Sequence, residues 1–205
     1  MRVRITFSKT GALKYIGHLD LNTIWERAAR RAGLPLAYTQ GFHPQPKMNF
    51  ASALPLGFSS RCEVMDMRLN EKMDLNLVWV QLQSAMPAGI GIVKIESVDE
   101  RAPALPMQIV SAEYEATLTE AVDGAGLRRK MDELMASPSL PRQRRGKDYD
   151  LRPLIEKIEL ISEDKIFMRL AAREGATGRP EEVLDVLGIV IENARVERTT
   201  LIFKN

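Results

Sequence analysis

Cysteine and histidine are scarce in this sequence. The chain has one cysteine, Cys62, and two histidines, His18 and His43. A single cysteine excludes a disulfide within the chain and a metal cluster held by several cysteines of that chain. These three residues also argue against a structural zinc site, which takes four such ligands. We therefore expect no metal, no bound cofactor and a reducing compartment, the cytoplasm.

Long apolar runs and an excess of one charge are also missing. No run of about 18 apolar residues occurs, which argues against a membrane span. Residues 1–7 alternate like a strand and lack the apolar block of a signal peptide. The 29 basic and 27 acidic residues give a net charge of +2, too balanced to indicate nucleic-acid binding by itself. The length of 205 residues suits one large domain or two small ones.

The apolar periodicity of the first half predicts the order strand, helix, strand, strand, helix, strand. Val3, Ile5 and Phe7 alternate with polar residues, as in a half-buried strand. The first helix carries an apolar stripe through Leu21 and Trp25. The elements are expected at residues 2–7, 19–32, 48–54, 63–69, 75–86 (after an N-cap at Asp74) and 90–95. This order is typical of the ferredoxin-like fold.

The same order recurs weakly in the second half, after a proline-containing stretch without periodicity. The expected elements are a strand at 110–118, a helix around 127–135, a strand or flexible basic arm at 140–147, a hairpin at 158–161 and 166–172, a helix from Pro180 to about 188, and a strand at 196–203. The sequence therefore predicts an α+β protein of two tandem ferredoxin-like (βαββαβ) units with antiparallel sheets. Their expected bounds are 1–98 and 109–205, joined by a linker at 99–108.

Residues 38–47 predict a stiff, exposed loop. Pro44 and Pro46 cannot donate to a sheet, and each restricts the residue before it to extended conformations. Gly41 permits a sharp turn. Such a loop would present Gln40, Phe42, His43, Gln45 and Lys47, with the aromatic ring free to stack on a base and the lysine on phosphate. In the alternative, Phe42 packs into the core and the prolines only brace the start of the next strand.

Two basic clusters follow from residue spacing. Arg27, Arg30 and Arg31 share one helix face at i, i+3 and i+4. They indicate either contact with an RNA backbone or a solvated helix face. The second cluster is Arg142, Arg144, Arg145 and Lys147, which indicates either a flexible arm on nucleic acid or a solvated hairpin tip.

The start of the first helix offers two further candidates. Lys9 precedes a turn where backbone amides attract anions, so it either contacts phosphate or belongs to an ordinary turn. His18 and Asp20 are spaced for acid–base chemistry, but no nucleophile or metal set accompanies them. The alternative is that Asp20 caps the helix and His18 packs at its start.

Five segments in order resemble a bacterial family of radical SAM-linked proteins, a domain of unknown function encoded beside or fused to radical SAM proteins. The segments are Phe7-Ser-Lys-Thr-Gly11, Gly17-His-Leu-Asp20, Arg30-Arg-Ala-Gly-Leu-Pro35, Gln40-Gly-Phe-His-Pro-Gln-Pro-Lys47 and Ala53-Leu-Pro-Leu-Gly57. The resemblance implies a radical SAM protein as partner and a role in RNA metabolism. The chain itself lacks the three-cysteine motif of a radical SAM enzyme.

Together these observations favour a non-enzymatic RNA-binding module that presents a tRNA- or rRNA-like substrate to such a partner. The expected RNA-binding residues are Lys9, His18, Arg27, Arg30, Arg31, Gln40, Phe42, His43, Lys47, Arg142, Arg144, Arg145 and Lys147. One alternative is a metal-independent RNA endonuclease, similar in architecture to the CRISPR repeat-processing enzymes, that uses His18, Tyr15 and Lys9. Another is an adaptor that binds only protein.

Overall fold

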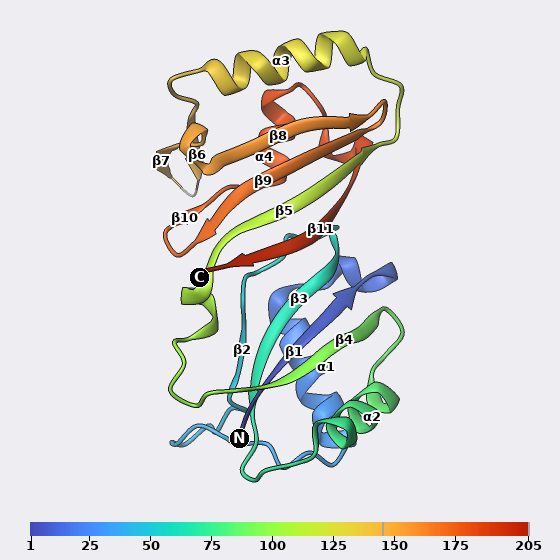
Figure 1. Cartoon of the computed structure of the whole chain (residues 1–205), viewed down its shortest axis with the longest axis vertical. Helices are drawn as coiled ribbons and strands as arrows, with labels where there is room; N and C mark the ends of the chain where they lie inside the picture. Colours follow the sequence, from blue (N-terminus) through green and yellow to red (C-terminus); the bar gives the residue numbers. More distant parts are fainter. Residues whose placement is uncertain (145, 205) are drawn as a thin grey trace. The chain divides into compact units, whose positions relative to one another are not determined.

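The structure is a computed structural model that describes residues 1–144 and 146–204 (Figure 1). It divides the chain into two units, Met1–Gln108 and Ile109–Asn205. Each unit combines helices with antiparallel strands, so the protein belongs to the α+β class. In the described residues, no helix has both the length and the apolar content needed to cross a membrane.

The first unit holds four strands and two α-helices. Its elements are β1 (Arg2–Lys9), the 3₁₀ turn η1 (Gly11–Tyr15), α1 (His18–Arg31), β2 (Met48–Phe50), β3 (Ser59–Arg68), α2 (Leu75–Ala85), β4 (Ile90–Val98) and η2 (Leu105–Gln108). All neighbouring strands are antiparallel, in the order β2-β3-β1-β4. The chain therefore crosses from β1 to β2, and from β3 to β4, by way of a helix each time.

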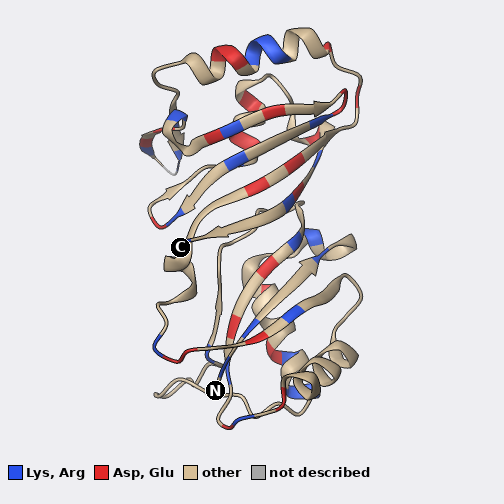
Figure 2. Ribbon diagram, in the orientation of Figure 1, with Lys and Arg blue, Asp and Glu red and all other residues tan. Residues whose placement is uncertain are grey.

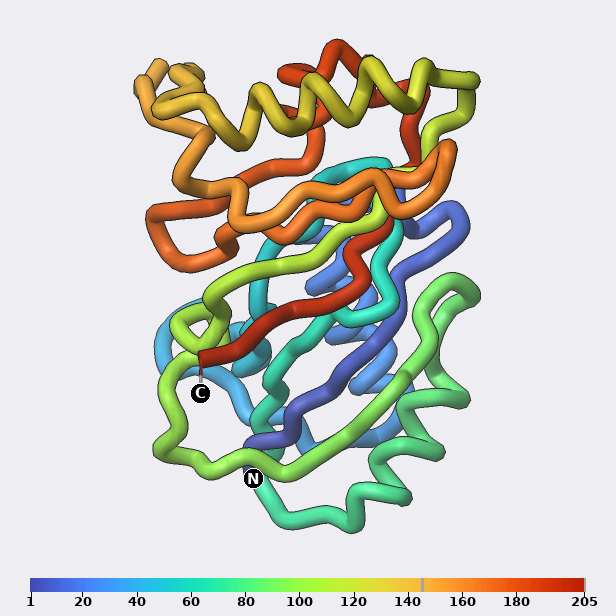
Figure 3. Tube along the Cα trace, turned by 45° about the horizontal axis from the view of Figure 1, so that its top comes forward, coloured from blue at the N-terminus to red at the C-terminus, as the bar shows by residue number. Residues whose placement is uncertain are grey.

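The core of the first unit lies between one face of this sheet and both helices (Figure 3). The alternation of β1 places Val3, Ile5 and Phe7 on that face, all fully buried. The ring of Trp25 from α1 meets that of Phe7 edge-on, with 4.8 Å between ring centroids. Val78 of α2 is also fully buried in this core. Burial of each such side chain stabilises the fold by about 1.5–3 kcal/mol, which makes this face the main source of stability in the unit.

Residues 99–108, expected to be a linker, fall within the first unit. The Arg2 guanidinium donates hydrogen bonds of 2.7 Å and 2.8 Å to the carbonyl oxygens of Ala102 and Pro103. Leu105 is fully buried. Arg2 and Arg4 also share the buried carboxylate of Asp66, at 2.7 Å and 2.8 Å. The segment is thereby fixed to the first strand of the unit.

The second unit has the same order of elements with two additions. Its elements are β5 (Ile109–Leu118), α3 (Gly124–Ala136), β6 (Pro141–Arg144), β7 (Lys147–Asp150), η3 (Arg152–Leu154), β8 (Ile155–Ser162), β9 (Lys165–Arg173), β10 (Ala176–Thr177), α4 (Pro180–Val186), η4 (Ile191–Asn193) and β11 (Ala194–Phe203). The main strands are antiparallel in the order β8-β9-β5-β11. The additions are the hairpin β6–β7 and the short strand β10 on the edge of β9.

Most sequence-predicted elements lie within a few residues of their observed bounds. Asp74 caps α2 as predicted, because its carboxylate accepts hydrogen bonds from the amides of Asn76 and Leu77. The strand expected at 48–54 ends at Phe50. The Ala51 amide still donates to the Val64 carbonyl of β3; beyond it the chain leaves β3 and reaches η1, where the Gly57 amide donates to the Lys14 carbonyl. For the segment 140–147 the sequence predicted either a strand or a flexible basic arm. In the structure this segment contributes to the β6–β7 hairpin.

Candidate nucleic-acid interface

The proline-containing loop between α1 and β2 is braced at its base. Tyr38 and Pro46 form an isolated β-bridge. The Thr39 amide donates to the Gln45 carbonyl at 2.8 Å, and the Gln45 amide donates to Thr39 Oγ1 at 3.0 Å. Gly41 at the tip has φ +122°, a conformation that favours glycine. The predicted stiff, exposed loop is therefore confirmed.

The side chains of the loop tip point into solvent. Phe42 has 102% of its reference area exposed, so the alternative in which it packs into the core is wrong. Gln40, His43, Gln45 and Lys47 are also exposed. Within the described part of the chain, none of these four side chains makes a hydrogen bond or ion pair. The loop thus presents donors, acceptors and one aromatic ring without internal partners.

The three arginines of α1 share an exposed face, as predicted, but their side chains diverge. Arg30 pairs with Glu26 at 2.8 Å and lies over the Tyr38 ring, 5.7 Å from its centroid. Arg31 donates to the Ala85 carbonyl at the end of α2. Arg27 is exposed and makes no ion pair among the described residues. Arg30 therefore borders the base of the loop, through an aromatic ring that the sequence analysis did not assign to the site.

Lys9 and His18 lie at the opposite end of α1. His18 is its first residue and Arg31 its last, and 14 residues of helix span about 20 Å. Lys9 is buried, and its ammonium donates to the Ile16 carbonyl at 3.1 Å, which corrects its assignment as a surface phosphate contact. The strand alternation that buries Phe7 also turns Lys9 inward. The set Lys9, Tyr15 and His18 therefore does not present an exposed cation for RNA cleavage.

His18 itself is exposed and packs against the core. Its ring meets the Phe50 ring edge-on, with 5.1 Å between centroids. The helix cap is Gly17, and Asp20 lies in the first turn without capping the helix. The packing role proposed for His18 is thus observed, and the capping role proposed for Asp20 is wrong.

The basic cluster of the second unit is not a free arm. Arg142 pairs with Asp185 at 3.0 Å. The Arg144 Nε donates to Glu182 Oε1 at 3.0 Å, and the same guanidinium lies over the Tyr149 ring, 4.7 Å from its centroid. Lys147 is exposed, and Arg145 lies outside the described residues. The two arginines hold the β6–β7 hairpin on α4, because acids of that helix neutralise them.

The pKa shifts of three residues in the hairpin agree with these contacts. Burial lowers the pKa of Arg144, but its hydrogen bond and charge interaction with the Glu182 carboxylate raise it by more. The net result is a raised pKa for Arg144. Burial and the same carboxylate raise the pKa of Tyr149, which keeps its hydroxyl protonated. At the base of the hairpin, amides of Leu140 and Arg152 donate to Asp150 and lower its pKa. These contacts stabilise a fixed hairpin.

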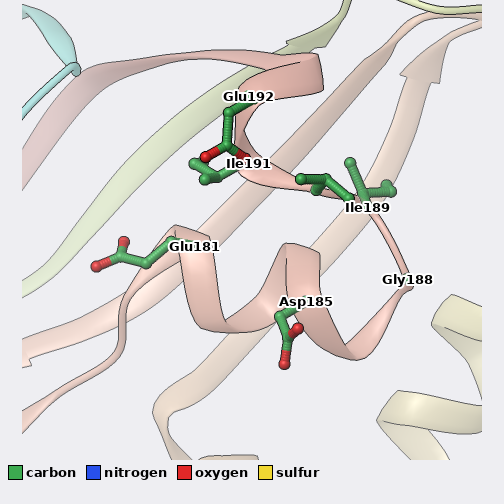
Figure 4. Close-up of a pocket in the computed structure, with 7 residues that line it drawn as sticks. Glu181, Asp185, Gly188, Ile189, Ile191 and Glu192 are labelled. Carbon is green, nitrogen blue, oxygen red and sulfur yellow. The ribbon is translucent and has the colours of Figure 1, made fainter.

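A depression of about 420 Å³ lies beside α4 (Figure 4). Three acids, Glu181, Asp185 and Glu192, line it with Ile189 and Ile191. Burial raises the pKa of Glu181. Among the described residues, no group of three or more His, Cys, Asp or Glu side chains is arranged to hold a metal ion. The acidic lining makes this depression unsuited to phosphate.

Elsewhere, acidic and basic residues are interspersed, as along β8 of the second unit (Figure 2). Lys157 pairs with Glu159, and Arg169 of β9 pairs with Glu113 of β5. The loop between α1 and β2 differs, since residues 38–47 contain no acid.

A family model described as an uncharacterized protein conserved in bacteria (DUF2344) matches residues 2–180. The chain belongs to this family. The resemblance to a bacterial family with a domain of unknown function is thus confirmed at that level. The loop and the first basic cluster lie within the segment that DUF2344 covers, as does the β6–β7 hairpin.

Comparison of this DUF2344 protein with curated sequences finds no match. Two solved structures are similar to it at low identity. A Cbf5-Nop10-Gar1 complex gives 11% identity and a TM-score of 0.47, covering 97% of this chain and 48% of the other. An archaeal box H/ACA sRNP Nop10-Cbf5 complex gives 12% identity and a TM-score of 0.43, covering 97% and 47%. The chain spans about half the length of the solved chains that it matches.

Proposed function

We propose that this protein is an RNA-binding accessory module, acting in the cytoplasm without catalytic activity of its own. RNA binds the loop interface, which consists of Arg27, Arg30, Gln40, Phe42, His43, Gln45 and Lys47. The observation that carries the proposal is the braced loop with exposed side chains that lack internal partners. A loop backbone that is already braced loses little conformational freedom on binding, which favours affinity.

The charge around the loop supports a polyanionic ligand. Residues 26–47 contain four basic residues and one acid, Glu26. That acid is engaged by Arg30, while Lys47 and Arg27 make no ion pair among the described residues. Such cations bind phosphates and release the counterions of the nucleic acid, the main source of sequence-independent affinity.

Seven of the predicted RNA contacts are left out of this proposal: Lys9, His18, Arg31, Arg142, Arg144, Arg145 and Lys147. For three of them the structure gives a direct reason. Lys9 is buried, and Arg142 and Arg144 are neutralised by acids of α4. The side chains of Arg142 and Arg144 are 32% and 25% exposed, against 59% for Arg30, so breaking their ion pairs to bind phosphate costs more. The proposal therefore assigns RNA binding to the first unit.

Each unit is proposed to be a ferredoxin-like fold, as the sequence predicted. In support, β2-β3-β1-β4 and β8-β9-β5-β11 are the same strand order when each unit is numbered from its own first strand. In both units a helix links the first strand to the second, and another links the third to the fourth.

A binding test across salt concentrations examines the RNA proposal directly. Arg30→Glu with Lys47→Glu should abolish binding of a structured RNA hairpin that the wild type retains at low salt. The logarithmic salt slope of the wild type should be negative, at about 0.7–0.9 per phosphate contacted. The matched control is Arg128→Glu with Lys147→Glu, which removes the same charge from exposed positions of the second unit. Equal affinity of the two double variants would contradict the proposal.

A second candidate function is docking of a protein partner, for which the family resemblance suggests a radical SAM protein. The supporting observation is a group of exposed apolar side chains near the start of α1. Tyr15, Leu19 and Leu56 are exposed by 68%, 80% and 64%. The hydrogen bond from the Gly57 amide to the Lys14 carbonyl brings the segment around Leu56 to η1. Apolar side chains gathered at the surface often mark protein interfaces.

Co-purification with the radical SAM partner, with and without nuclease, tests this second candidate. Tyr15→Ser with Leu19→Ser should release the partner and leave RNA affinity unchanged. Loss of the complex on nuclease treatment alone would show that RNA bridges the two proteins and would remove the docking surface.

A further inference from the structure

Phe42 is the most exposed large apolar side chain in the described part of the chain. Its exposure of 102% exceeds the 80% of Leu19, the next highest. Single exposed apolar residues are common and need no explanation by themselves. Phe42 differs because its loop is held in shape by the Tyr38–Pro46 bridge and the two hydrogen bonds between Thr39 and Gln45. The ring is therefore held in solvent by a rigid support.

We infer that Phe42 stacks on one unpaired nucleotide, so that the loop interface selects RNA with a bulged or single-stranded base over fully paired RNA. This inference rests on the proposed function and names the class of RNA that the interface takes. In a duplex, each base is covered on both faces by its neighbours, and a phenyl ring has no free base face to contact. An unpaired base can turn out and stack on an aromatic side chain.

The chemistry around the ring suits a single nucleotide. Residues 39–47 contain no other Phe, Tyr or Trp. The Tyr38 ring at the base is already covered by the Arg30 guanidinium. The amide of Gln40 and the imidazole of His43 are exposed beside Phe42 in sequence, where they can hydrogen-bond the edge of a base. Lys47, which follows at the base of the loop, can bind the adjacent phosphate.

The surroundings of Phe42 favour RNA over a protein ligand. Aromatic anchors of protein interfaces lie in a desolvated, largely apolar centre. Apart from Gly41 and Pro44, the exposed residues that accompany Phe42 in the loop are polar, and the loop contains Lys47 and no acid. An aromatic ring in a loop with amides and a cation matches a nucleotide, which joins a flat apolar face to polar edges and a phosphate.

The test compares two RNA hairpins of equal charge whose stems are closed by the same non-nucleotide linker, one with a single bulged 2-aminopurine and one fully paired, at one salt concentration. The wild type should bind the bulged hairpin about 5- to 150-fold more tightly, the range expected for one stacked base. Phe42→Ala should lose that preference and keep the weaker affinity common to both hairpins. Phe42→Tyr, which keeps the ring, should retain it. The 2-aminopurine emission should change on binding the wild type and not on binding Phe42→Ala.

The control variant separates failure of this inference from failure of the proposed function. Lys47→Ala should weaken binding of both hairpins equally, because it removes a phosphate contact. If Phe42→Ala binds both RNAs as the wild type does while Lys47→Ala weakens both, stacking is overturned and the loop interface remains. If the wild type binds neither hairpin at low salt, the proposed function fails and the inference with it. Phe42→Ala removes no buried area, so an unchanged urea midpoint should show that the variant folds.

Discussion

The loop between α1 and β2 and the hairpin β6–β7 look alike in sequence and differ in structure. Each is a short segment with basic and aromatic residues near a helix. In the loop, Lys47 makes no ion pair among the described residues and Phe42 is fully exposed. In the hairpin, Arg142 and Arg144 are paired with acids of α4, and the ring of Tyr149 is covered by Arg144. The difference teaches that the availability of a basic side chain to a ligand depends on whether the fold places an acid against it.

The largest loss of stability is expected at a third site, where the buried carboxylate of Asp66 pairs with two arginines. Asp66 is 2% exposed and holds Arg2 and Arg4. Asp66→Asn should lower the free energy of unfolding by about 3–5 kcal/mol, since it removes the carboxylate that pairs with the buried guanidinium of Arg2 and the partly buried one of Arg4. Urea denaturation measures this loss. The control Glu159→Gln, at the exposed pair with Lys157, should cost less than about 1 kcal/mol. Similar losses for both variants would contradict the importance of burial.

The hairpin itself provides the next test. Glu182→Gln should lower the free energy of unfolding by about 1–2 kcal/mol, because it removes the charged partner of Arg144 in a partly buried pair. RNA affinity should not change, although the variant leaves an extra positive charge. A clear gain in RNA affinity would show that Glu182 of α4 competes with RNA for Arg144. The hairpin would then be a second RNA-binding segment that α4 keeps occupied.

Two exposed lysines, Lys47 of the loop and Lys147 of the hairpin, compare the segments as ligand surfaces. Lys47→Ala should flatten the logarithmic salt dependence of RNA binding by about 0.7–0.9, the contribution of one phosphate. Lys147→Ala should leave it unchanged. The measurement is fluorescence anisotropy with one labelled RNA at four or more salt concentrations. Equal changes in salt dependence for the two variants would show that both segments contact RNA, and the proposed difference between loop and hairpin would be wrong.

The smallest effect concerns Glu181 on α4. Burial raises its pKa above the ordinary 4.5, so the folded state holds this proton more tightly than the unfolded state. Stability should therefore fall as the pH rises from 4.5 through the raised pKa. Glu181→Gln should remove that fall. The difference should stay below about 1 kcal/mol, because the side chain is 29% exposed. Denaturation of the wild type and of Glu181→Gln at pH 4 and pH 7 measures this difference. The same pH dependence of stability in both proteins would contradict the raised pKa of Glu181.

Local features of the sequence predicted much of the fold. The alternation of β1 and the stripe of α1 identified the elements that enclose Trp25, because periodicity decides which face is buried. The prolines and Gly41 identified the loop, since these residues restrict the backbone wherever they occur. The bounds of β2 were less predictable, because the strand ends where the chain stops pairing with β3, and this pairing is not encoded in the local sequence.

The partners of the basic residues could not be predicted in the same way. Arg142 and Arg144 alternate along a strand and so share one face, but Glu182 and Asp185 are about 40 residues away in sequence. Such pairing depends on how the hairpin meets α4, which no local pattern encodes. Lys9 is a different case. It continues the inward series of Val3, Ile5 and Phe7, so the period of two already indicated that it would be buried.

The closed base of the loop has a consequence for how this protein can change. The chain leaves the sheet region at Ala37 and returns to it at Lys47, whose amide donates to the Ala37 carbonyl at 2.8 Å. Residues 40–44 at the tip are all exposed and contribute nothing to the core. Residues 40–44 can therefore be shortened, exchanged or transplanted as a cassette while the rest of the first unit folds as before. Under the proposed function, ligand preference and foldability are carried by separable stretches of one chain, and either can be altered by mutation without the other.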